Sequence, residues 1–597
     1  MVKPVIFILG ISALPLAQQL KAGLDGEIHT PDCVNGGDVA FAKATAHLAS
    51  LFQQGRTIIG LCASGILIRA LGPHLNDKRS EPPVIAVAED GSSVVPLLGG
   101  HHGANDLARK IASLTKGHAA ITTASEVRFG FALDDVLPGY TLANPQDAKS
   151  ATAALLTDAS LSQIRHSGEG RNLIPFKNPP APIAEWTPAF AGVTVVVGEN
   201  IMAGNESKLV YHPHTLIIGV GCERGTPPQE VSDLIESTLR TNNLSIQSVA
   251  GFASIDLKED EPAISTLCNV RFFTAEELSA FSPKLKTPSD VVLAEVGTPG
   301  VAEAAALAAA GPDAELIVAK TKSRRATCAI ARAPRPVIDL RGRQRGVLSV
   351  VGIGPGTELM RSPASTQALQ AAAHWVGYDL YLDLAADVKS NQTEHRFPLG
   401  GEEARCRHAI ALAKQGEHVA LICSGDAGIY AMAALVYEII DLEPNRIQVD
   451  VFPGISAFQA AAAKAGAMIG HDFCCISLSD LLTPWDAIEK RLHAAATSDF
   501  VIAFYNPRSL KRRDQLERAF AILKNHRPPD TPVIIASNLG RPEETLKIVQ
   551  FHDFNPDDVD MLTLVMVGSS QSKSMRRGDG KTYAYTPRGY ARKRDNQ

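Results

Sequence analysis

The sequence predicts a multidomain α/β protein, in which two small α/β units precede a larger α/β region of two subdomains. Three observations favour this fold class. The chain has 597 residues, enough for about four domains at roughly 150 residues each. Short β-branched apolar runs alternate with helical stretches along most of its length. Several of these runs end in glycine-bearing turns, as strands do at the ligand edge of open α/β sheets.

Composition narrows the class of protein further. Hydrophobic residues make up 45% and charged residues 20%, and no stretch reaches the roughly 18 apolar residues of a membrane span. The first apolar run, VIFILG, suits a buried strand better than a signal peptide. Nine scattered cysteines without a C-x-x-C pair predict a reducing cytoplasm, no disulfides and no metal site. A net charge of −5 argues against a nucleic-acid partner.

The first third of the chain contains one predicted domain and one interruption. Residues 1–150 are predicted to form an α/β domain, because runs such as RTIIGLCASG and PVIAVAED alternate with helical stretches such as ANDLARKIASLTKG. Residues 151–210 are predicted to be a linker or insertion, since they are rich in Pro, Gly and turn residues without a sustained period. Within them, 164–194 resembles translated palindromic repeat elements of some bacterial genomes, and we expect no function of it.

The rest of the chain resumes the alternation. Residues 211–335 are predicted as a second α/β domain, which begins with strand, glycine turn and helix in TLIIGVGCERGTPPQEVSDLIESTLR. Residues 346–460 and 461–572 are predicted as the two subdomains of the C-terminal region. Residues 573–597 have eight Lys or Arg and no apolar period, which predicts a disordered basic tail, with a binding arm as the alternative.

Four loops of the C-terminal region follow apolar strands and bear glycine or suit close approach: GIGPG (352–356), CSGDAGIYAM (423–432), FPGISAFQAA (452–461) and TLVMVGSS (563–570). The first loop could suggest a dinucleotide site. However, Thr357 stands where the third glycine of that fingerprint belongs, and Pro355 lacks the N–H that a phosphate cradle uses. Taken singly, each loop favours a plain strand-to-helix turn over a ligand site.

In combination, these loops resemble the tetrapyrrole (uroporphyrinogen/precorrin) methyltransferases, over about 346–570. The stretches VVGIGPGTELM, WVGYDLYLDL, SGDAGIYAMAALVYE and FYNPRSLKRRDQL are most similar to the precorrin-3B C(17)-methyltransferase branch of cobalamin biosynthesis. Ala427 stands where the family often has a proline. The resemblance implies S-adenosylmethionine as cofactor, a tetrapyrrole substrate and a possible homodimer. The cofactor residues that it implies are Gly354, Pro355, Gly356, Gly425, Asp426, Gly428, Ser456, Ala457 and Thr563. An Asx-turn or helix cap is the alternative role for Asp426.

The implied reaction joins methyl transfer, mainly a positioning task, to a ring contraction that needs proton removal from an alcohol. Candidates for that proton transfer are His471 and Tyr505, with Asp472 and Asp480 nearby in sequence. The carboxylates of a tetrapyrrole favour guanidinium partners, for which Arg508, Arg512 and Arg541 are candidates beside Lys511 and Arg513. A solvated basic face is the alternative for each of these.

The N-terminal domain contains a glycine turn with two histidines, Gly99 to Gly103, followed by Asp106 at a helix start. This segment, together with GVGCERGTPPQEV and EVGTPGVAEAAAL, resembles cobalt-precorrin-5A hydrolase. The resemblance implies lactone opening, for which His101 or Asp106 could activate water. Further polar candidates are Lys78, Glu89, Asp256, Lys258 and Lys320. The sequence therefore predicts a bifunctional enzyme of cobalamin biosynthesis. The alternative is a methyltransferase fused to a non-catalytic tetrapyrrole-binding module.

Overall fold

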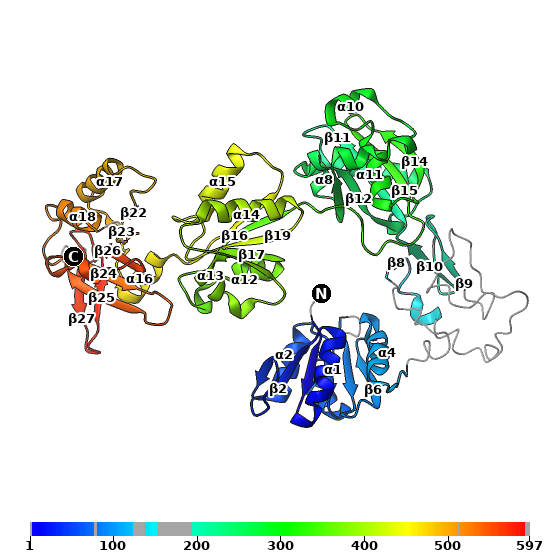
Figure 1. Cartoon of the computed structure of the whole chain (residues 1–597), viewed down its shortest axis with the longest axis horizontal. Helices are drawn as coiled ribbons and strands as arrows, with labels where there is room; N and C mark the ends of the chain where they lie inside the picture. Colours follow the sequence, from blue (N-terminus) through cyan, green and yellow to red (C-terminus); the bar gives the residue numbers. More distant parts are fainter. Residues whose placement is uncertain (1–2, 77–79, 123–137, 152–193, 510–512, 591–597) are drawn as a thin grey trace, which may run out of the picture.

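The structure, a computed structural model, describes residues 3–76, 80–122, 138–151, 194–509 and 513–590. Strands and helices alternate in successive α/β units along the chain (Figure 1). The predicted α/β, multidomain fold class is confirmed.

The N-terminal unit is a doubly wound sheet with strand order β3-β2-β1-β4-β5-β6-β7. Successive residues of β1 face opposite sides: Ile6 and Ile8 pack with α1 and α4, whereas Val5 and Phe7 pack with α2 and α3. Its strands are β1 (Val5–Ile8), β2 (Glu27–Pro31), β3 (Val39–Phe41), β4 (Ile58–Leu61), β5 (Val84–Val87), β6 (Ser93–Leu98) and β7 (His118–Ala119). Its helices are α1 (Leu14–Leu24), α2 (Ala44–Gln53), α3 (Ser64–Leu71) and α4 (Ala104–Thr115), with short 3-10 turns η1 (Ile11–Ala13), η2 (Gly72–His74) and η3 (Gly100–His102).

A small sheet of order β8-β10-β9 follows, formed by β8 (Tyr140–Leu142), β9 (Thr194–Val197) and β10 (Lys208–Pro213). This corrects the domain limits that the sequence predicted. Residues 194–210 belong to a sheet and not to a linker, because the valines of β9 pair in parallel with β10. The strand β8, placed in the first domain by sequence, pairs with β10 instead. The predicted insertion at 164–194 lies outside the described residues except for its last position.

The middle unit, residues 216–332, has strand order β13-β12-β11-β15-β14. Gly219 lets helix α11 approach the sheet, since a Cβ there would lie 1.8 Å from the Ala302 carbonyl oxygen. The strands are β11 (Leu216–Cys222), β12 (Val249–Ile255), β13 (Val270–Phe273), β14 (Glu315–Lys322) and β15 (Ala326–Arg332). The helices are α7 (Pro228–Thr241), α8 (Pro262–Ser265), α9 (Ala275–Ser279), α10 (Asp290–Val296) and α11 (Val301–Ala310), with η5 (Ile246–Ser248), η6 (Asp256–Lys258) and η7 (Ser282–Lys284).

No single helix in the described ranges is long and apolar enough to cross a membrane. Helices α10 and α11 pass that test only as a pair, and the pair is bent by 74°.

The first C-terminal subdomain is a parallel sheet of order β18-β17-β19-β16-β20. Helices α14 and α15 cover one face, and α12 and α13 cover the other. The strands are β16 (Val347–Gly352), β17 (His374–Tyr378), β18 (Thr393–Phe397), β19 (His418–Cys423) and β20 (Gln448–Phe452). The helices are α12 (Pro363–Ala371), α13 (Asp379–Asp383), α14 (Glu402–Lys414) and α15 (Met432–Leu442), with η8 (Glu358–Met360) and η9 (Ala386–Val388).

The second C-terminal subdomain has strand order β22-β23-β26-β24-β25 and is mostly antiparallel. Helices α17 and α18 cover one face and α16 covers the other. The strands are β22 (Phe473–Ser477), β23 (Val501–Tyr505), β24 (Pro532–Ser537), β25 (Thr545–Gln550) and β26 (Thr563–Val567). The helices are α16 (Ala457–Ala465), α17 (Trp485–Thr497) and α18 (Gln515–Leu523), with η10 (Phe551–Asp553) and η11 (Pro556–Asp558). The predicted boundary at 460 therefore falls inside α16.

The prediction of a disordered tail from residue 573 is wrong. Strands β27 (Lys573–Arg576) and β28 (Thr582–Tyr585) form an antiparallel hairpin that adds to β21 (Gly466–Ala467). Ala584 is fully buried in the core beside α16, and the Thr586 hydroxyl donates to the Met468 carbonyl at 2.6 Å. The basic residues in the described part of this segment are exposed, so their charges remain solvated when the hairpin folds.

An ion pair connects the middle unit to the first C-terminal subdomain: Arg446 contacts Asp260 at 3.6 Å. Arg343, in the segment that leads from β15 to β16, pairs with Asp256 at 3.2 Å and Glu259 at 2.7 Å and exchanges backbone hydrogen bonds with Phe272, so it belongs to the middle unit.

Candidate functional site

Three glycine loops meet at the carboxyl edge of the parallel sheet in the first C-terminal subdomain. Gly354 and Gly425 exchange backbone hydrogen bonds of 3.1 and 2.7 Å. A Cβ on Gly454 would lie 2.0 Å from the Gly425 carbonyl oxygen, and one on Gly352 would lie 2.7 Å from the same atom. Because these neighbours are backbone atoms, only glycine allows the three loops to meet so closely. The structure thus brings together the predicted residues Gly354 and Gly425.

Asp426 holds two of these loops in register. Its Oδ1 accepts from the Gly428 N–H at 2.8 Å, which is an Asx-turn, and its Oδ2 accepts from the Gly454 N–H at 3.1 Å. The local role considered for Asp426 is therefore present in the structure. A contact of Asp426 or Gly428 with a ligand stays a prediction.

Arg541 joins the second C-terminal subdomain to the loops of the first. Its Nε donates to the Pro355 carbonyl at 3.1 Å, and its Nη2 donates to the Ser424 hydroxyl at 3.0 Å. A Cβ on Gly356 would lie 2.6 Å from both Arg541 Cγ and the Gly540 carbonyl oxygen. Burial lowers the pKa of Arg541 from its usual value. This predicted substrate residue therefore lies at the glycine loops, and two of its guanidinium nitrogens bond to the first subdomain.

A second arginine, which sequence reasoning missed, lies on α14. Arg405 is 2% exposed and has no hydrogen bond from its guanidinium among the described residues; its nearest acid, Glu402, is 3.6 Å away. Burial raises the pKa of the Tyr381 phenol, whereas the charges of Arg541 and Arg405 both lower it. Both positive charges therefore act on the Tyr381 phenol. A buried cation whose acid lies 3.6 Å away is poorly compensated, and a bound anion would stabilise it.

Three family models match the chain: Cobalamin synthesis G N-terminal over residues 46–126, Cobalamin synthesis G C-terminus over 216–331, and Tetrapyrrole (Corrin/Porphyrin) Methylases over 347–554. A Salmonella typhimurium protein named "Probable cobalt-factor III C(17)-methyltransferase" is 45% identical over 244 residues, which are 41% of this chain and 99% of that protein. The chain belongs to the tetrapyrrole methylase family. The methylase segment is preceded by the two cobalamin-synthesis G segments, so the resemblance seen in the sequence is confirmed.

Two further relatives match the methylase segment. A Sinorhizobium sp protein named "Precorrin-3B C(17)-methyltransferase" is 39% identical over 249 residues, which cover 41% of this chain and 98% of that protein. The solved structure of "the methyltransferase CobJ" is 39% identical, covers 40% of this chain and 100% of that chain, and has a TM-score of 0.38.

Tyr505 lies where the two subdomains of the methylase meet. It ends β23, its ring centroid is 5.2 Å from that of Tyr430, and its hydroxyl accepts from the Phe458 N–H at 3.5 Å. Burial raises the pKa of the Tyr505 phenol well above its usual value, so it keeps its proton at neutral pH. Ser456 and Ala457 lie beside this group as the N-cap and first residue of α16, with the Ser456 N–H bonded to Gln459 at 2.9 Å.

The other predicted residues of the methylase have local structural partners. His471 is exposed and bonds to the Pro587 carbonyl at 2.8 Å, while Arg508 binds Pro556 and Asp557 at 2.6 and 2.9 Å. The Thr563 hydroxyl donates to Asp560 at 2.5 Å. No described contact joins these side chains to the glycine loops. Among the lesser candidates, Asp480 accepts from Gln515 at 2.9 Å, and Lys511 and the predicted substrate residue Arg512 lie outside the described residues.

The histidine turn of the N-terminal unit is built by two left-handed glycines, Gly99 at φ 74° and Gly103 at φ 85°. Asp106 lies in the first turn of α4, its side chain is 85% exposed, and it pairs with Arg109 at 2.6 Å. The side chain of His101 lies outside the described part of the structure. Asp106 is therefore a surface carboxylate with an ion-pair partner.

The further polar candidates of the N-terminal half mostly have structural partners as well. Glu89 accepts from Ser12 at 3.1 Å, Asp256 pairs with Arg343, and the Lys320 ammonium donates to the Thr287 carbonyl at 2.8 Å. Lys78 lies outside the described residues. In the part of the chain that the structure describes, no three His, Cys, Asp or Glu side chains gather so that they could hold a metal ion.

Proposed function

We propose that the chain is a bifunctional enzyme of cobalamin biosynthesis, whose C-terminal region methylates a precorrin-3B-type tetrapyrrole at carbon 17 with ring contraction. The observation that carries this proposal is the junction of Gly352, Gly354, Gly425 and Gly454 at the sheet edge of the first subdomain, to which Arg541 connects the second. The names of the relatives, a cobalt-factor III and a precorrin-3B C(17)-methyltransferase, support the substrate class.

The residues of this junction fit S-adenosylmethionine. At Gly425 a Cβ would meet no atom nearer than Ser456 Cα at 4.0 Å, which leaves the backbone there open to a nucleoside, and Pro355 removes an N–H that a pyrophosphate would need. Gly354, Gly356, Gly425 and Ser456 would hold the cofactor, which supplies an electrophilic methyl group when bound. The chain itself orients the two reactants and excludes water at the subdomain interface.

The tetrapyrrole would bind through its carboxylates. Arg541 contacts the loops at Pro355 and Ser424, and the buried Arg405 is a second candidate, because bidentate contacts to carboxylates are the contacts that Arg makes best. Tyr505 would act as a hydrogen-bond or proton donor through its hydroxyl, because its protonated phenol is unsuited to act as the base.

The N-terminal half would open a lactone on a corrin precursor, as its resemblance to cobalt-precorrin-5A hydrolase implies. A non-catalytic tetrapyrrole-binding module is the second candidate, favoured by the exposed, ion-paired state of Asp106. His101→Ala and Asp106→Ala variants separate the two. Lactone opening that persists in both variants would remove these residues as catalysts, and its absence from the unmodified chain would favour the binding module.

The test of the methyltransferase is mass spectrometry of the product formed from S-adenosylmethionine and precorrin-3B, run in parallel with the cobalt-containing substrate under anaerobic conditions. We expect one added methyl group and a ring-contracted spectrum. Absence of methyl gain with both substrates, from protein that binds the cofactor, would refute the assigned substrate.

A further inference from the structure

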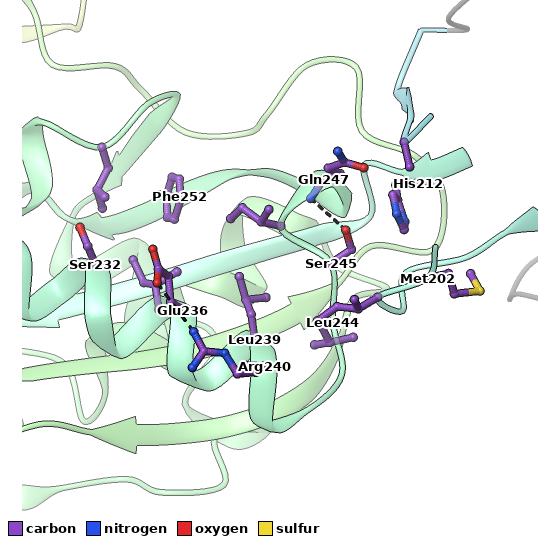
Figure 2. Close-up of a pocket in the computed structure, with 15 residues that line it drawn as sticks. Met202, His212, Ser232, Glu236, Leu239, Arg240, Leu244, Ser245, Gln247 and Phe252 are labelled. Carbon is purple, nitrogen blue, oxygen red and sulfur yellow. Dashed lines mark hydrogen bonds and ion pairs between the residues drawn. The ribbon is translucent and has the colours of Figure 1, made fainter. Parts of the chain in front are cut away.

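A groove of about 670 Å³ lies in the middle unit, and residues of α7, η5 and β10 line it (Figure 2). Its wall is mostly apolar, and several of its polar groups bond to one another. Arg240 pairs with Glu236 at 4.0 Å, and the Ser245 hydroxyl accepts from the Gln247 N–H at 3.2 Å. Because these groups satisfy one another, the groove alone does not define the chemistry of a ligand.

Tyr430, in the methylase, has a backbone conformation that a tyrosine disfavours. Its φ is 51°, in the left-handed region, where a bulky residue is an outlier. It lies in the loop between β19 and α15, which also contains Gly425 and Asp426. Strain of this kind persists only where neighbouring contacts hold the residue, and it is found mostly at functional sites. The contacts of Tyr430 therefore indicate its role.

These contacts reach the second C-terminal subdomain. The Tyr430 hydroxyl donates to the Cys475 carbonyl of β22 at 2.8 Å. Its ring centroid lies 5.2 Å from that of Tyr505, which ends β23, and the two ring planes are tilted by 49°. The preceding residue, Ile429, packs against the core between α16 and the second sheet. Two successive side chains thus fasten this loop of the first subdomain to the second.

The same loop holds the glycine junction together. Asp426, four residues before Tyr430, accepts from the N–H groups of Gly428 and Gly454. A shift of the loop relative to β22 would therefore move the junction relative to Tyr505. The rate of methyl transfer depends on such alignment, because the reacting groups must be held close and correctly oriented.

We propose that Tyr430 is a positioning residue of the methyltransferase, which fixes the distance between the glycine junction and Tyr505 through its hydroxyl bond to β22 and its ring contact. The proposal rests on the proposed function, which assigns the cofactor to the junction and a proton donor to Tyr505. The Tyr430 hydroxyl is committed to Cys475, so the residue acts through its neighbours. Since 52% of its surface is exposed, Tyr430 contributes little to the core, and its replacement should leave the fold intact.

Tyr430→Phe retains the ring contact and removes the hydroxyl bond. We expect the rate of single-turnover methyl transfer and the affinity for S-adenosylhomocysteine to fall about fivefold each, the usual effect of one hydrogen bond. The KM for the tetrapyrrole and the melting temperature should stay unchanged. Tyr430→Gly also removes the ring, and glycine adopts φ 51° without strain, so this variant tests the side chain on the same backbone. We expect its rate to fall about 100-fold, as for a misplacement of about 1 Å.

Tyr437→Phe is the matched control. Tyr437 lies on α15, the helix that follows the same loop, and 51% of its surface is exposed. Its hydroxyl bonds to no residue that the structure describes. The rate and the affinity of this variant should therefore equal those of the unmodified chain.

Unchanged rate and affinity in folded Y430F and Y430G would overturn the proposal. So would a loss that appears only in the melting temperature and in the fraction of active molecules, which a structural role alone produces. If the unmodified chain binds S-adenosylhomocysteine but methylates neither precorrin-3B nor its cobalt-containing counterpart, the assigned substrate is refuted. In that case a fivefold lower affinity of Y430F, with Y437F unchanged, would still uphold the positioning role.

Discussion

Replacing Gly454 by alanine tests whether the meeting of the glycine loops builds the methyltransferase site. The new Cβ would lie 2.0 Å from the Gly425 carbonyl oxygen, 2.8 Å from Gly352 C and 2.9 Å from Gly352 O. Since all three neighbours are backbone atoms, no side-chain rotation relieves the clash. The loops must separate by about 1.4 Å to restore an ordinary contact of 3.4 Å. A displacement of that size costs about 1–3 kcal/mol of stability by overpacking.

The displacement should lower the rate of methyl transfer strongly, while the variant still folds. A misplacement of about 1 Å at a reacting centre lowers the rate by about 100-fold. Calorimetric titration with S-adenosylhomocysteine and single-turnover methylation measure binding and rate separately. Gly401→Ala is the matched control, because its Cβ would lie 3.4 Å from its nearest neighbour, the Pro398 carbonyl oxygen, in a loop away from the junction. Unchanged affinity and rate in folded G454A would refute the reasoning.

Three further predictions follow from the same structure. Arg405→Met should leave the melting temperature unchanged or higher, since it removes a buried charge whose acid lies 3.6 Å away, but should raise the KM for the tetrapyrrole at least tenfold; a lower melting temperature with unchanged KM would make Arg405 structural. Deletion of residues 573–597 should lower stability by about 2–4 kcal/mol because it uncovers the core around Ala584, whereas a chain that ends at Tyr590 should melt normally in calorimetry. Burial lowers the pKa of His29 to about 4 in the folded N-terminal unit, against about 6.5 in the unfolded chain. The unfolded chain therefore binds a proton at His29 more readily than the folded unit does. The free energy of unfolding should be unaffected above pH 6.5 and should fall by up to about 3 kcal/mol as the pH falls to 4. Hydrogen exchange of β2, corrected for the intrinsic effect of pH, should show this loss, and His29→Gln should reduce it.

The parallel α/β units could be predicted from the sequence because each buried strand is a nearly continuous apolar run that ends in glycine. VLSVVGI and HVALICSG became β16 and β19 in this way. The hairpin β27–β28 could not, since its edge strands bear charge and only Ala584 contributes a buried apolar group to the core there. The sequence contains one weak indication of this hairpin, the alternation of larger and smaller side chains in TYAY, which forms β28.

For the site, the sequence predicted which loops approach one another but not which side chains join them. Gly354 and Gly425 follow from strand order at one sheet edge, whereas the partners of Arg541 come from loops 186 and 117 residues away in sequence. Arg405 was missed because an arginine within the helical run GEEARCRHAIALAK has the pattern of a surface residue.

The contact of Arg446 with Asp260, 3.6 Å between two side chains that are each 38% exposed, makes the coupling between the middle unit and the methylase depend on ionic strength. The Debye length falls from about 10 Å at 0.1 M salt to about 3 Å at 1 M. We therefore expect the two units to reorient more independently in concentrated salt, while each of them stays folded. Neighbouring catalysts joined in this way can move apart without unfolding, and their separation sets how far a labile product diffuses to its next acceptor.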